Sequence, residues 1–63
     1  MAAKRAKLEV YRSEDGDWRW RLVARNGEIL AWGEGYTRKS GALRGINALM
    51  RSAAEALIVV PPP

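Results

Sequence analysis

Three arginines and two aromatic residues could form a binding surface if the middle of the chain folds as a sheet. The arginines are Arg19, Arg21 and Arg25, and the aromatic residues are Tyr11 and Trp32. Guanidinium groups contact phosphates, and aromatic rings offer surfaces on which unpaired bases stack. On one open sheet face these side chains predict a nucleic-acid interface. The competing interpretation is a solvated face whose arginines are occupied by cross-strand ion pairs and cation–π contacts.

A second group of residues could hold a small anion such as a nucleotide. Arg38 and Lys39 follow residues 33–35 at the start of an expected helix, where free backbone amides attract negative charge. The segment lacks the spacing of a phosphate-binding loop, and Glu34 would repel an anion. This hypothesis therefore ranks behind the nucleic-acid interface.

The residue types argue against an enzyme. The sequence contains no histidine and no cysteine, and no pair of carboxylates converges for acid–base chemistry. Asp15 and Asp17 flank Gly16, but two carboxylates are too few for a calcium loop. We therefore expect no catalytic residue, no metal site and no cofactor.

Length and charge favour association. A chain of 63 residues buries only about 60% of the surface that its unfolded form exposes, and no disulfide can supplement the core. A homodimer is therefore expected. The net charge of +4 favours an acidic partner, either nucleic acid or an acidic protein. No segment approaches the ~20 apolar residues of a membrane span, so we expect a cytoplasmic protein with a flexible basic arm over residues 1–7.

The alternation of apolar and charged residues over residues 18–24 predicts the central strand of an antiparallel sheet. Residues 8–12 alternate in the same way and predict one neighbouring strand, and residues 28–32 are predicted as the return strand that follows the turn at Asn26-Gly27. Turn-forming residues 13–17 join the first pair of strands, and Asn26-Gly27 predicts a two-residue type I′ turn in the second.

The two hairpin registers agree on which residues share a face. They place Glu9 opposite Arg21 and Arg25 opposite Glu28, which leaves Arg19 as the least compensated arginine. They also place Tyr11 beside Arg19 and Trp32 beside Arg21, where cation–π contacts are expected. The opposite, core face is predicted to contain Leu8, Val10, Trp18, Trp20, Leu22, Ala24, Ile29 and Ala31.

From Arg38 onward the apolar spacing is that of a helix, with Thr37 as the expected N-cap. The stripe expected to cover the core face is Ala42, Leu43, Ile46, Leu49, Met50 and Ala53. Gly41 and Gly45 weaken a helix, so they are either tolerated surface glycines or the site where a second helix approaches across a dimer.

The apolar residues 56–60 predict a final strand covered on both faces, which residues 61–63, all proline, terminate. An isolated edge of this kind promotes aggregation, so pairing with a second copy is expected. The predicted dimer interface consists of Leu57, Ile58, Val59, Val60, Gly41 and Gly45.

Several short motifs follow one another within residues 8–60: residues 26–28, residues 33–36, Lys39, Ala42 and residues 45–46. Their order and spacing resemble the YegP-like family of small bacterial domains of unknown function. The resemblance implies three antiparallel strands, a helix and a last strand, either as tandem repeats or as two subunits that exchange their last strands. One copy of the unit implies the two-subunit form, and the family brings no catalytic residues.

The sequence thus predicts an α+β domain of order β-β-β-α-β over residues 8–60, with a proline tail at residues 61–63. Its predicted function is that of a non-catalytic homodimeric binding module, with nucleic acid as the first candidate ligand. The alternatives are a protein-interaction or structural adaptor, for which the exposed patch at Leu30 and Trp32 is suited, and a binder of a small anion.

Overall fold

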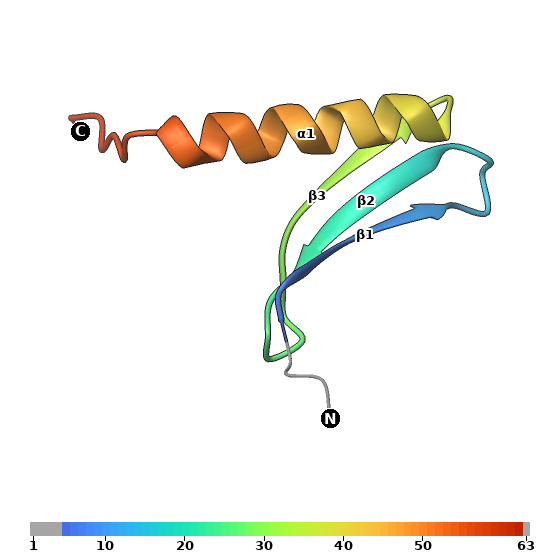
Figure 1. The fold of residues 1–63 in the computed structure, drawn as a ribbon, viewed down its shortest axis with the longest axis horizontal. Helices are drawn as coiled ribbons and strands as arrows, with labels where there is room; N and C mark the ends of the chain where they lie inside the picture. Colours follow the sequence, from blue (N-terminus) through green and yellow to red (C-terminus); the bar gives the residue numbers. More distant parts are fainter. Residues whose placement is uncertain (1–4, 63) are drawn as a thin grey trace.

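The computed structural model describes residues 5–62 and shows a three-stranded antiparallel sheet followed by one helix (Figure 1). The strands are β1 (Lys7–Arg12), β2 (Trp18–Val23) and β3 (Ile29–Tyr36), and the helix is α1 (Lys39–Glu55). The strand order is β1-β2-β3, so the sheet is a meander with β2 in the centre. The predicted α+β class, the meander and the single helix are confirmed.

The predicted C-terminal strand is absent from the described part of the chain. Residues 56–62 have no regular secondary structure, although the backbone of Ala56 is extended, with φ −67° and ψ 138°. A strand requires a neighbouring strand that accepts and donates its hydrogen bonds. In this chain the segment leaves the far end of α1 away from the sheet (Figure 1), so no such neighbour is within reach.

The predicted ends of the chain are described only in part. Residues 1–4 of the expected basic arm and the last residue of the proline tail lie outside the described residues. Arg5 and Ala6 are exposed without regular structure, whereas Lys7 already belongs to β1. The strand therefore begins one residue earlier than the alternation predicted.

The register between β1 and β2 agrees with the prediction at every position. The pairs run from Leu8 with Leu22 to Arg12 with Trp18. Between β2 and β3, Trp20 pairs with Gly33 as predicted, and the two following pairs are also correct. The sheet therefore places the Trp20 side chain on one face and its neighbours in the strand on the other.

The turn between β2 and β3 is longer than the predicted type I′ turn. The amide of Gly27 donates to the Ala24 carbonyl over 2.9 Å, and the Ala24 amide donates to the Glu28 carbonyl over 2.7 Å. Gly27 has a φ of +91°, whereas no residue other than glycine has a positive φ in the described chain, so Asn26 does not adopt the conformation that type I′ requires. The loop is a type I turn that Gly27 closes in the left-handed region.

This longer turn changes the face of one predicted core residue. Ile29 pairs with Val23 rather than with Ala24, and the register shifts between Leu22 and Val23. Leu30 is the extra residue of the resulting bulge. Ile29 and Leu30 are both more than half exposed, so the prediction that Ile29 belongs to the core is wrong.

The core is centred on the indole of Trp20. Trp20, Ala42 and Ile46 are the buried apolar side chains of the described chain. A Cβ added at Gly33 would overlap the Trp20 ring, so the ring lies directly over the Gly33 backbone. Trp20 Nε1 donates a hydrogen bond of 3.2 Å to the Tyr36 hydroxyl, which links the core to the end of β3.

Tyr36 in turn contacts α1. A Cβ added at Gly45 would lie 2.6 Å from the Tyr36 hydroxyl oxygen, and one at Gly41 would lie 3.7 Å from Tyr36 Cδ1. Both glycines thus face a side chain of their own copy. This contact gives an intramolecular reason for the small residues, while the predicted helix–helix contact at these positions stays a prediction.

The helix α1 packs on the sheet mainly through its first half. Ala42 and Ile46 are buried and Leu49 is half-buried, but Leu43, Met50 and Ala53 of the predicted stripe are exposed, Met50 by 57%. The second half of α1 extends beyond the strands (Figure 1). The stripe prediction is therefore confirmed for Ala42 and Ile46 and in part for Leu49, and it is wrong for Leu43, Met50 and Ala53.

The start of α1 differs from the prediction by one residue. The helix begins at Lys39 with Arg38 as its N-cap, and no side chain caps it. Thr37 therefore lies outside the helix and is not the N-cap. The amides of Gly41 and Ala42 both donate to the Arg38 carbonyl, over 3.1 Å and 3.3 Å.

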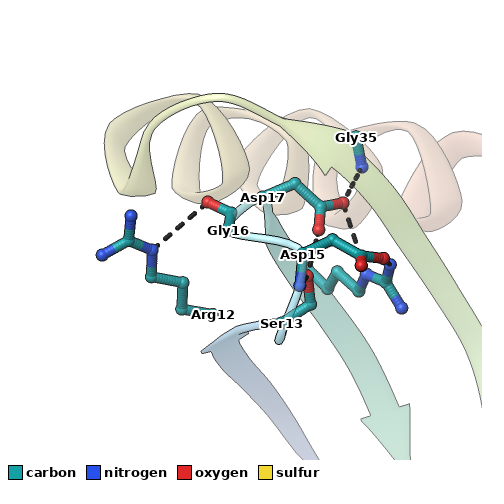
Figure 2. Close-up of polar contacts among 7 residues, drawn as sticks. Arg12, Ser13, Asp15, Gly16, Asp17 and Gly35 are labelled. Atoms are coloured by element: carbon teal, nitrogen blue, oxygen red, sulfur yellow. Dashed lines mark hydrogen bonds and ion pairs between the residues drawn. The ribbon is translucent and has the colours of Figure 1, made fainter.

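Asp17 joins the first turn to the end of β3 (Figure 2). Its carboxylate accepts hydrogen bonds from the Ser13 hydroxyl and, over 3.0 Å, from the amide of Gly35. Gly35 has a φ of +85° in a second register irregularity of β3, which turns its amide away from the strand ladder. These hydrogen bonds, led by that of Ser13, lower the pKa of Asp17 from 3.8 to about 2.

We predict opposite effects for two alanine substitutions in α1. Gly45→Ala should destabilise the fold by about 1–3 kcal/mol, because the new Cβ would overlap Tyr36. Gly41→Ala has room for its Cβ and should stabilise the helix by up to about 1 kcal/mol. Urea unfolding at one fixed protein concentration measures both, and equal effects of the two substitutions would contradict the Tyr36 contact.

We also predict that Asp17 makes the stability of the fold depend on pH in the acidic range. A carboxyl whose pKa is lowered in the folded state stabilises that state while it is ionised, so the contribution is present above pH 3.8 and is lost as the pH falls towards about 2. Thermal unfolding should therefore show a smaller drop in melting temperature across this range for Asp17→Asn than for the wild type. Glu14→Gln, which removes an exposed carboxyl from the same turn, is the control for the loss of charge.

Candidate functional site

The sheet face opposite Trp20 carries the predicted binding residues of β1, β2 and β3. Side chains alternate along a strand, so the neighbours of Trp20 point away from α1. We call this surface the outer face; it contains Glu9, Tyr11, Arg19, Arg21 and Trp32. Trp32 is 68% exposed.

Arg21 lies at the centre of the outer face and is held by two neighbours. Its Nε donates a hydrogen bond of 2.6 Å to Glu9 Oε1, and its guanidinium carbon lies 4.8 Å from the centre of the Tyr11 ring. Arg21 is also the cross-strand partner of Trp32. The predicted Glu9–Arg21 pair is confirmed. Tyr11 was predicted to make a cation–π contact with Arg19, but it makes this contact with Arg21, diagonally across the strands.

The charges around Arg21 stabilise each other. The hydrogen bond from Arg21 and then that from Lys7, whose Nζ lies 3.3 Å from Glu9 Oε2, lower the pKa of Glu9. The same carboxylate raises the pKa of Arg21. These groups are partly exposed, so water and salt weaken their attraction. The ion pair therefore serves mainly to orient the two side chains.

Arg19 is bound to the first turn. Its Nε lies 3.3 Å from Asp17 Oδ2 and its Nη2 lies 3.4 Å from Asp15 Oδ2. The hydrogen bond to Asp17 is the chief cause that raises the pKa of Arg19. The expectation that Arg19 is the least compensated arginine is therefore wrong, because the acidic turn folds back over the start of β2.

Arg25 lies apart from the other two arginines. It is exposed in the loop after β2, and the ion pairs of residues 5–62 do not include the predicted one with Glu28. The longer turn pairs Glu28 with Ala24 instead. Of the predicted cluster, the structure thus brings together Tyr11, Arg21 and Trp32.

Arg38 and Lys39 lie at the start of α1, at a separate site. An open hollow of about 320 Å³ is lined there by Gly35, Tyr36, Thr37, Arg38, Ser40, Gly41 and Arg44. The first turn of α1 contains no acidic residue. Lys39 is not among the lining residues, and Arg44 was missed. The sequence could have indicated Arg44, because this residue follows Ser40 by four positions and the two therefore lie on one side of a helix.

The described residues contain few other groups suited to chemistry. Across residues 5–62, no three acidic, histidine or cysteine side chains gather closely enough to hold a metal ion. The one helix of this part of the chain is neither long nor apolar enough to cross a membrane. The outer face and the hollow at α1 are therefore the two candidate sites.

Known proteins resemble this chain in both sequence and fold. A UPF0339 protein of Methanosarcina acetivorans is 44% identical over 55 residues, which cover 87% of this chain and 95% of the relative. A UPF0339 protein of Treponema denticola is 42% identical over 53 residues, or 84% of this chain and 91% of the relative. An NMR solution structure of a protein from Haloferax volcanii matches 92% of this chain and 98% of its own, with 41% identity and a TM-score of 0.79.

The same relationship is found with a family model. Residues 13–59 match the model described as a domain of unknown function (DUF1508). This match includes the first turn with Asp17, the strands β2 and β3, and all of α1. It confirms the resemblance to the YegP-like domains: the chain belongs to the DUF1508 family, together with the UPF0339 proteins.

Proposed function

We propose that the protein is a non-catalytic homodimeric binding module whose outer face binds single-stranded nucleic acid. The observation that carries this proposal is the exposed ring of Trp32, which pairs across the strands with Arg21. The guanidinium group of Arg21 also lies over the Tyr11 ring, 4.8 Å from its centre. A base stacked on an aromatic ring of this kind contributes about 1–3 kcal/mol, and the net charge of +4 attracts a polyanion.

The carboxylates of the outer face determine how such binding works. Arg19 and Arg21 both contact acidic side chains, so they attract phosphates less than free arginines do. Stacking on Trp32 then contributes more than charge neutralisation. Affinity should depend on salt less steeply than in a protein that contacts many phosphates.

The uncovered apolar surface supports the homodimer. The accessible surface is 5655 Å², whereas a compact monomer of 7.0 kDa exposes about 4,000 Å². The excess resides partly in the second half of α1 and in residues 57–60, each of which is at least three-quarters exposed. A stable interface buries about 800 Å² on each partner, which is within this excess.

In the proposed dimer, residues 57–60 of each copy add to the sheet of the other, as the family resemblance implies. Three of these residues, Ile58, Val59 and Val60, are β-branched, and the outer edges of β1 and β3 have no neighbouring strand in the described chain. Exchange of this segment covers the apolar residues and supplies the hydrogen bonds that a strand requires.

A second candidate function is the binding of a small anion in the hollow at the start of α1. The hollow of about 320 Å³ brings Arg38 and Arg44 to the positive end of the helix, where no side chain caps the amides. A rise in melting temperature with a free nucleotide, without binding of single strands, would favour this site.

Protein partners that survive nuclease treatment would instead favour an adaptor that uses Leu30 and Trp32.

We predict that Trp32→Ala weakens the binding of a fluorescein-labelled single-stranded oligonucleotide about tenfold, because one stacking contact is lost. Fluorescence anisotropy at low salt measures the dissociation constant. Leu43→Ala removes an exposed apolar side chain from the first half of α1, away from the outer face, and is the control. Equal losses in the two variants, or no binding by the wild type, would contradict the outer-face interface.

We predict further that light scattering finds a particle of twice the 7.0 kDa chain mass and that Ile58→Asp converts it to a monomer. Ile58 is 97% exposed in a single copy, so the substitution should cost little unless another copy covers it. Asn47→Asp introduces the same charge change at an exposed position of α1 and should leave the dimer intact. A folded wild-type monomer would refute the proposed assembly.

A further inference from the structure

Arg21 has a fixed orientation but unused hydrogen-bond donors. Its Nε donates to Glu9, and its guanidinium plane lies near the Tyr11 ring. The hydrogen bonds of Arg21 within residues 5–62 use Nε alone, and the side chain is 41% exposed. Its two Nη groups therefore remain available to a ligand that approaches the outer face.

The same contacts offset the positive charge of Arg21 and leave its two Nη groups as directional donors. Glu9 Oε1 lies 2.6 Å from Nε and offsets the positive charge. A guanidinium fork matches a pair of adjacent acceptors. Among the purines, guanine presents such a pair, O6 and N7, whereas adenine presents one acceptor beside a donor. Because Glu9 already offsets its charge, Arg21 suits the edge of a guanine better than a phosphate.

Trp32 provides the stacking surface that brings a base to this donor pair. Residues directly opposite each other in an antiparallel pair have Cβ atoms about 4.5–5.5 Å apart, and Arg21 and Trp32 are such partners. The Arg21 guanidinium group itself leans toward Glu9 and Tyr11 of β1, so a base that stacks on Trp32 and extends across β2 presents its edge to the Nη groups. Arg19 does not offer this arrangement, because both its Nε and its Nη2 contact carboxylates of the first turn.

We infer that the outer face selects guanine in single-stranded nucleic acid, with the Nη groups of Arg21 donating to guanine O6 and N7. Glu9 and Tyr11 act as positioning residues that hold the guanidinium group in place. This inference rests on the proposed binding of single strands at the outer face and adds the identity of the base.

The test compares labelled thymine-rich strands that contain guanine, adenine, cytosine or 7-deazaguanine at the same positions. Lithium buffer prevents guanine quadruplexes, and anisotropy gives the dissociation constants. We expect about tenfold tighter binding of the guanine strand than of the adenine strand. The 7-deazaguanine strand, which lacks the N7 acceptor, should fall to the level of adenine.

Three variants separate the roles of Arg21 and Glu9. Arg21→Lys keeps the positive charge but loses the fork, so the guanine preference should disappear while the adenine strand still binds, which also shows that the variant is folded. Glu9→Ala should weaken the preference because the guanidinium group is no longer oriented. Glu9→Gln retains an oxygen that accepts from Nε and should keep the preference.

The outcomes distinguish this inference from the proposal on which it rests. If the wild type binds none of the strands, both the proposed function and the guanine selection are refuted. If it binds all four strands equally, or prefers cytosine or 7-deazaguanine, the outer face binds single strands but the assignment of Arg21 to guanine is wrong. Loss of the preference in Glu9→Gln as in Glu9→Ala would refute the positioning role of Glu9.

Discussion

The fold depends on the packing of the Trp20 indole between the sheet and the helix. The ring lies over the backbone of Gly33, and its Nε1 donates to the Tyr36 hydroxyl over 3.2 Å. Tyr36 lies against Gly45 of α1. This series of contacts ties β2, β3 and α1 together and explains two glycines that would otherwise weaken a strand and a helix. A large ring requires a small neighbour at each of these positions.

The position of this contact also determines what remains uncovered. Tyr36 ends β3 shortly before α1 begins, so the first half of α1 is the part that Tyr36 holds against the sheet. Its second half and residues 57–60 then lie beyond the strands (Figure 1). With three buried apolar side chains in the described chain, a single copy gains little from the hydrophobic effect. A second copy that covers this surface, as proposed, would enlarge the core.

The two arginines of β2 have different roles despite their similar sequence context. Arg19 lies within reach of Asp15 and Asp17, so it stabilises the first turn together with the Ser13 and Gly35 contacts of Asp17. Arg21 has one carboxylate and one ring as neighbours and keeps its Nη groups free within the described chain. Arginines at alternate positions of a strand therefore do not show how much positive charge is available to a ligand until their acidic partners in the fold are known.

The sequence alone determined the elements that depend on local periodicity: the meander, the register of β1 with β2, the Glu9–Arg21 pair and the presence of α1. These follow because strand side chains alternate with a period of two and helix side chains with a period of 3.6. The tertiary structure decided the bulge at Leu30, the partners of Arg19 and the contact of Tyr36 with Gly45. Asn26-Gly27 is compatible with both turn lengths, and the other contacts join residues whose approach depends on how the turn and the helix fold over the sheet, which no local pattern contains.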